Sequence, residues 1–138
     1  MFILWITLAL LFVAACYDLH SREIPHAFAA LVLCVGLAST GFGWSGIGWV
    51  AMVLGVALGF AAGFGLYALG GLAGGDVKLI AALGAVLGWK ALLGVLFYVA
   101  VFGGALALIA RWRNQTEYAY APAIALGLLA YIGRGYLR

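Results

Sequence analysis

The chain has 138 residues, of which 68% are hydrophobic and 8% are charged, and its formal net charge is +3. Soluble domains carry about 25% charged residues, and a soluble fold of this size has too much surface for its volume to hide so many apolar groups. The composition therefore excludes an ordinary soluble domain and predicts an integral membrane protein.

Six apolar runs predict six membrane-spanning helices, and the charged residues fall between these runs. In chain order the runs cover residues 2–17, 26–39, 47–69, 77–89, 91–110 and 122–132. Lys90 marks the turn between the fourth and fifth runs. No Lys or Arg precedes the first run, so we expect it to be retained as a span rather than cleaved as a signal peptide. These runs predict an all-α, polytopic membrane protein in which residues 1–138 form a single membrane-embedded domain.

The fourth run is short for a membrane span. Its 13 residues would cover about 20 Å, whereas the hydrocarbon core is about 30 Å thick. We therefore expect either a locally thinned bilayer or a position for Asp76 below the membrane surface, in a wet pocket lined by protein. The loops on the Asp76 side carry slightly more Lys and Arg than the opposite side. This asymmetry favours a cytoplasmic location for that side, with both termini outside.

Several small residues and both cysteines lie inside the apolar runs. Gly55, Gly59 and Gly63 recur at four-residue spacing, which predicts a face where helices approach closely. Cys16 and Cys34 are interpreted as packing residues rather than a disulfide pair. No pattern indicates a metal site or a cofactor, and the scattered basic residues do not predict a nucleic-acid partner. The oligomeric state is not indicated by these patterns.

Two aspartates stand out, because they are the only ones in the chain. Asp18 begins the loop after the first run, and Asp76 precedes the fourth run. Each has a structural explanation: Asp18 can pair with Arg22 four residues later, and Asp76 can be the N-cap of a helix. With alternating spans, however, the end of the first span and the start of the fourth lie on the same membrane face, so the two carboxylates can meet.

Two carboxylates that share a site cannot both ionise easily, so they share a proton. In this state one carboxylate can take a proton from water, which attacks a peptide carbonyl. The other, protonated, polarises that carbonyl and later supplies a proton to the leaving amine. Gly74 and Gly75 would let an extended substrate approach the backbone closely. The pattern therefore indicates an aspartic protease.

Two motifs, in this order, also resemble a known family. They are D-x-x-x-R-x-I-P at 18–25 and G-G-D-V-K-L-x-A-A-L-G at 74–84. Together they resemble the type IV prepilin peptidases, membrane aspartic proteases of the GxGD class. Ala73 is a departure, because the family pattern has glycine three residues before the aspartate.

The resemblance implies that Asp18 and Asp76 are the catalytic pair, and Gly74 and Gly75 are assigned a supporting role. Arg22 and Lys78 either orient the carboxylates or anchor the chain at the membrane surface. The implied substrates are pilin-like precursors of the Flp type, which serve pili and protein secretion. Their short basic leader would be cut at the cytoplasmic face of the bacterial inner membrane, before an apolar helix.

The resemblance also bears on what the chain does not do. Larger family members carry a zinc-binding insertion and methylate the new N-terminus. The segment between Asp18 and Pro25 has no room for that insertion, so N-methyltransferase activity is not expected. Two alternatives to the protease stay open: a small transporter whose aspartates bind a cation or relay protons, and a structural subunit without activity.

Overall fold

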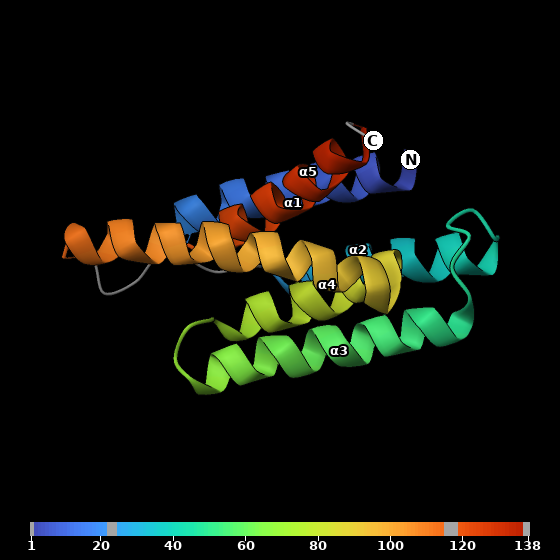
Figure 1. Ribbon diagram of the computed structural model, residues 1–138, viewed down its shortest axis with the longest axis horizontal. Coiled ribbons are helices and arrows are strands. Elements are labelled where there is room, and N and C mark those ends of the chain that lie inside the picture. Colours follow the sequence, from blue (N-terminus) through green and yellow to red (C-terminus); the bar gives the residue numbers. More distant parts are fainter. Residues whose placement is uncertain (1, 22–24, 115–118, 137–138) are drawn as a thin grey trace.

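A computed structural model describes residues 2–21, 25–114 and 119–136. This part of the chain forms five helices, one of them bent, and contains no strand, which confirms the all-α prediction (Figure 1). The helices are α1 (Phe2–Ser21), α2 (His26–Gly41), α3 (Trp49–Ala68), α4 (Gly74–Trp112) and α5 (Ala121–Tyr136).

Helix α4 is two helices joined at a sharp bend. Gly88 at the bend has φ 69° and ψ 169°, a backbone conformation that is open almost exclusively to glycine. Figure 1 shows the first arm of α4, residues 74–87, running beside α3 and the second arm, residues 89–112, returning in the opposite direction. The chain therefore reverses direction between the fourth and fifth predicted spans, as expected. The predicted position of this turn, Lys90, is wrong by two residues. The charge at Lys90 marks the end of the apolar run, whereas the backbone can reverse only at Gly88.

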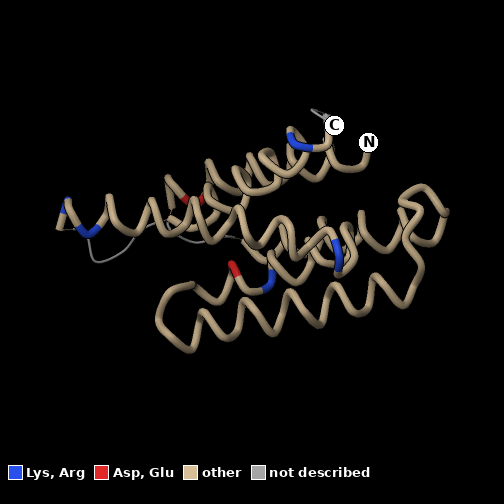
Figure 2. The backbone as a smooth tube through the Cα atoms, in the orientation of Figure 1, with Lys and Arg blue, Asp and Glu red and all other residues tan. Residues whose placement is uncertain are grey.

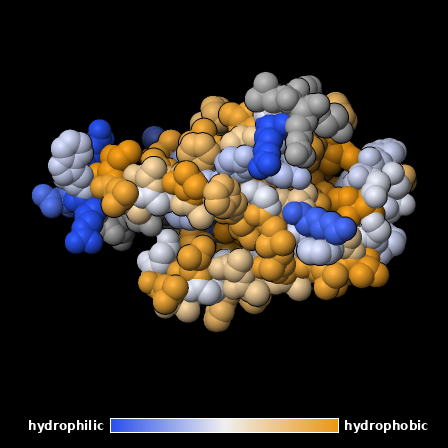
Figure 3. Space-filling model, viewed as in Figure 1, coloured by the Kyte–Doolittle hydropathy of each residue, from blue (hydrophilic) through white to orange (hydrophobic). Residues whose placement is uncertain are grey.

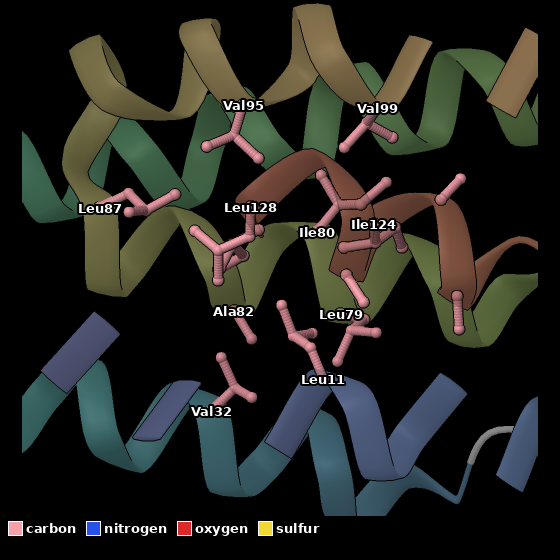
Figure 4. Close-up of a cluster of buried hydrophobic side chains, with 14 of the residues drawn as sticks. Leu11, Val32, Leu79, Ile80, Ala82, Leu87, Val95, Val99, Ile124 and Leu128 are labelled. Carbon is pink, nitrogen blue, oxygen red and sulfur yellow. The ribbon is translucent and has the colours of Figure 1, made fainter. Parts of the chain in front are cut away.

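The first arm of α4 is the centre of the fold. Every residue from Leu79 to Gly88 is buried. Side chains from the surrounding helices meet on this arm: Leu11 of α1, Val32 of α2, and Ile124 and Leu128 of α5 (Figure 4). Because its neighbours are protein, this arm need not match the bilayer. Its 14 residues cover about 21 Å, in agreement with the short span predicted here.

Helix α3 packs on this central arm through small residues. Gly55, Gly59 and Gly63 are three of the four residues that α3 buries. A Cβ atom at Gly59 would lie 2.6 Å from the carbonyl oxygen of Ile80, and one at Gly55 would overlap the carbonyl oxygen of Gly84. The prediction that this glycine face allows close helix packing is confirmed.

The outer surface of the described chain is apolar. Large side chains such as Phe2, Phe12, Trp49, Phe97 and Leu108 are exposed, and Figure 3 shows hydrophobic residues over most of the visible face. Charged positions are few and scattered along the chain (Figure 2). By length and composition α1, α3 and α4 can each cross a membrane. An apolar surface of this extent is stable in contact with lipid and not with water, so the chain is an integral membrane protein.

The glycine contact predicts a measurable loss of stability. Gly55→Ala places a methyl group against the backbone of α4, and overpacking of this kind costs about 1–3 kcal/mol. Thermal unfolding of the detergent-solubilised protein should therefore shift to lower temperature. Gly104→Ala is the matched control, because a Cβ atom there meets nothing within 4 Å. Equal midpoints for the two variants would contradict the close packing of α3 on α4.

Candidate active site

The two aspartates are both buried at helix ends. Asp18 lies in the last turn of α1 and is 6% exposed, while Asp76 lies in the first turn of α4 and is 3% exposed. The prediction that Asp18 begins a loop is wrong, because α1 continues to Ser21. A helix can run a turn beyond its apolar face when polar side chains find partners there. Aspartate is rarely this buried unless it is paired or functional.

Asp18 is held by the start of α5. The backbone N–H of Ala121 donates a hydrogen bond to Oδ2 of Asp18 over 3.2 Å, and the backbone of Tyr120 donates a second. The first N–H groups of a helix have no partner within the helix, and the helix dipole favours negative charge at this end. The start of α5 therefore offsets part of the cost of burying the Asp18 carboxylate. Arg22, the alternative partner of Asp18, lies outside the described residues.

Asp76 stabilises the start of its own helix. It does so from the first turn of the helix and not from the N-cap position that the sequence predicted. The helix begins at Gly74 with Ala73 as the N-cap residue, and the backbone N–H of Ala73 donates to Oδ2 of Asp76 over 3.4 Å. An acidic residue three positions after the N-cap can reach back to that N–H in this way, so the helix starts three residues earlier than expected. The other oxygen, Oδ1, is buried and has no hydrogen-bond partner among the described residues.

The fold buries both carboxylates at helix ends. Asp18 lies in α1 and Asp76 in α4, which are far apart in the sequence. Buried polar atoms nearly always have a hydrogen-bond partner, so the unsatisfied Oδ1 of Asp76 calls for an explanation. A carboxyl oxygen in this position is available to a group that enters the site from outside the described chain.

The other predicted site residues are less directly involved. Lys78 is exposed, and within the described part of the chain it forms no ion pair with either aspartate. Its side chain lines a separate groove of about 330 Å³ together with His26 and residues of α2 and α3. Gly74 is exposed, and a Cβ atom there would meet nothing within 4 Å. Gly75 is half-buried beside Asp76.

Ala73 occupies its position without strain. Its φ of −82° and ψ of 156° are extended values that any L-residue adopts. The hydrogen bond to Asp76 uses the backbone of Ala73, not its side chain. This structure therefore gives no reason for glycine at position 73.

Sequence reasoning did not identify the backbone of Tyr120 and Ala121 as part of the site. Pro122 is a signal for a helix start, and alternation of the spans places that start on the same face as Asp18. The hydrogen bond itself joins residues 103 positions apart. No local pattern identifies which N–H meets which carboxylate.

A bundle of apolar helices that buries two aspartates at its helix ends defines an integral membrane protein with carboxyl groups shielded from water. The comparisons with known proteins agree with this class. The chain belongs to the type IV leader peptidase family, since the model of that family matches residues 5–108. The resemblance inferred from the two motifs is thereby confirmed.

Individual relatives give the same result. The chain is 36% identical over 132 residues to a prepilin leader peptidase/N-methyltransferase of Bacillus subtilis (strain 168), a match that covers 91% of this chain and 53% of that protein. It is 44% identical over 61 residues to a protein with the same description from Burkholderia pseudomallei (strain 1026b), covering 41% and 20% of the two chains. The chain thus spans about half the length of its Bacillus relative. Its match to the Burkholderia protein covers a smaller part of that protein. No solved structure matches it.

The geometry at Ala73 predicts the effect of restoring the family residue. Glycine adds freedom to the unfolded chain, which costs about 0.4–1 kcal/mol, but at an N-cap it is preferred over alanine by a similar amount, so Ala73→Gly should leave the free energy of unfolding nearly unchanged. Thermal or denaturant unfolding in detergent measures this free energy. A clear gain in stability would show that alanine is strained at this position.

Proposed function

We propose that this chain is a membrane aspartic endopeptidase that removes the leader peptide of type IV pilin-like precursors, with Asp18 and Asp76 as its catalytic pair. One observation carries the proposal: aspartates from two different helices are both buried at helix ends, and Oδ1 of Asp76 has no hydrogen-bond partner among the described residues. Membership of the type IV leader peptidase family supports the same reaction.

The hydrogen bonds divide the catalytic roles between the two aspartates. Asp18 accepts bonds from two backbone groups at the start of α5, an arrangement that favours the ionised form. Asp76 accepts one long bond, and its Oδ1 is free within the described chain. We therefore assign Asp18 as the general base and Asp76 as the protonated general acid.

The reaction then proceeds with a balanced transfer of protons. Asp18 takes a proton from a water molecule, whose oxygen bonds to the peptide carbonyl carbon while Asp76 gives its proton to the carbonyl oxygen. In the second step the carbon–nitrogen bond breaks. The leaving amine takes the proton from Asp18, and a hydroxyl group of the intermediate returns a proton to Asp76. Both carboxyl groups are thereby restored.

The proposal extends to the substrate and its location. The precursors would be of the Flp type, inserted in the bacterial inner membrane by an apolar helix. The distribution of Lys and Arg supports a site at the cytoplasmic face, with both chain termini outside. Six residues separate Asp18 from Pro25, too few for the zinc-binding insertion of larger relatives. We accordingly propose cleavage without N-methylation.

Neutralising either aspartate tests the mechanism. Asp18→Asn removes the base and Asp76→Asn removes the acid, and each loss should slow leader cleavage by about 10²–10⁴-fold. Cleavage of a co-expressed pilin-like precursor is followed by the shift in its mass. Lys90→Gln is the control, because this residue also loses its charge but lies beyond the bend of α4. Full cleavage by either Asn variant would rule out the two-carboxylate mechanism, and two active variants would favour the transporter or structural alternatives.

The shared proton predicts a bell-shaped dependence of the cleavage rate on pH. At acidic pH both carboxyl groups are protonated, and no base is available to activate water. At alkaline pH both are ionised, and no acid is available to protonate the carbonyl oxygen. Initial rates in detergent, measured from acidic to alkaline pH with the fold checked at each end, should fall on both sides of an optimum. A rate that rises steadily with pH would contradict the role of Asp76 as an acid.

A further inference from the structure

An apolar groove outside the aspartate pair lies between α1 and α5. Its volume is about 500 Å³. The residues that line it are apolar and come from these two helices alone: Trp5, Leu8, Ala9, Phe12, Ala15, Cys16 and Leu19 of α1, and Pro122, Ala125, Leu126 and Leu129 of α5. The proposed mechanism does not use this groove.

The α1 side of the groove has the pattern of a helix-packing seam. Trp5, Phe12 and Leu19 recur every seven residues and are 46%, 65% and 67% exposed. Small residues, Ala9 and Ala15, lie between them. Another helix can pack along α1 when large side chains recur at heptad spacing and small residues lie between them. From Trp5 to Leu19 the seam is about 21 Å long, which matches a helix of about 14 residues.

One end of the groove adjoins Asp18. Leu19, in the groove wall, directly follows Asp18. On the other wall Pro122 directly follows Ala121, whose N–H donates to Asp18. A helix lying in the groove would therefore bring the chain at its end to the proposed base.

The second apolar groove, between α2, α3 and α4, suits such a helix less well. It is smaller, at about 330 Å³, and it has Lys78 and His26 in its walls. An apolar helix in that groove would desolvate these polar groups without offering them a partner, and burial of unpaired polar groups is costly.

We propose that the groove between α1 and α5 receives the apolar helix of the precursor and so places the scissile bond at Asp18 and Asp76. This inference rests on the proposed function and adds the binding site of the substrate helix. The precursor would enter sideways from the bilayer. Close packing on the small residues then replaces lipid contacts, which is the main source of affinity between helices in a membrane.

Filling the groove tests the proposal. Ala9→Phe projects a ring into the groove, nine positions before Asp18, and Ala30→Phe does the same in the second groove, which makes it the matched control. Each variant is assayed with the full precursor in lipid vesicles and with a short soluble peptide that spans the cleavage site. For Ala9→Phe, kcat/KM should fall at least about tenfold with the precursor and stay unchanged with the peptide. Ala30→Phe should behave as wild type with both.

Several results would overturn the proposal. Unchanged cleavage of the precursor by Ala9→Phe shows that the helix does not bind there, and slower cleavage by Ala30→Phe assigns it to the second groove. Equal losses on precursor and peptide show damage to the fold. Failure of the proposed function is distinct, since wild-type protein would then leave the precursor intact or Asp18→Asn would still cleave it.

Cross-linking locates the helix independently of any rate. In a background of Cys16→Ala and Cys34→Ala, the variant Phe12→Cys should form a disulfide with cysteines placed in the precursor helix. Leu33→Cys in the second groove should not. Cross-links between two copies of Phe12→Cys, in place of cross-links to the precursor, would assign the groove to a second copy of this chain and refute the proposal.

Discussion

The close contact between α3 and the first arm of α4 is the constraint on which the rest of the structure depends. The glycines at 55, 59 and 63 remove side chains from the interface, so the two backbones meet directly. In a bilayer no hydrophobic force drives helices together, and contact of this kind supplies the packing energy. It holds the first arm at the centre, where α1, α2 and α5 can surround it. Asp76 is carried on the start of this arm, so the position of the site follows from the packing.

Burial of two carboxylates would be expensive without compensation. Within the described residues the fold supplies it with backbone groups: Asp18 uses N–H groups at the start of α5, and Asp76 uses the N–H of Ala73. The compensation is unequal, because one oxygen of Asp76 is left without a partner in the described chain. In the proposed mechanism this inequality would give two chemically identical side chains different roles, as acid–base catalysis requires.

The start of α5 connects the aspartate site to the bilayer. Ala121 donates to Asp18, and the next residue, Pro122, is in the wall of the groove that faces outward between α1 and α5. A helix that approaches from the lipid therefore reaches the carboxylate along one continuous surface. In the proposed function, where the substrate is itself anchored in the membrane, this arrangement would give the substrate access to Asp18 without a large opening to water.

The sequence by itself determined the class of protein, the helical segments, the glycine face of α3 and the two aspartates, because each depends on composition or on spacing along one chain. Only the tertiary structure decided that α4 bends at Gly88 and not at Lys90, that Asp18 lies within α1, and that Asp76 reaches back to Ala73. Those features depend on backbone conformation. The partner of Asp18, at the start of α5, is 103 residues away. A hydrogen bond between distant segments is set by how the helices pack, and no local pattern of residues encodes it.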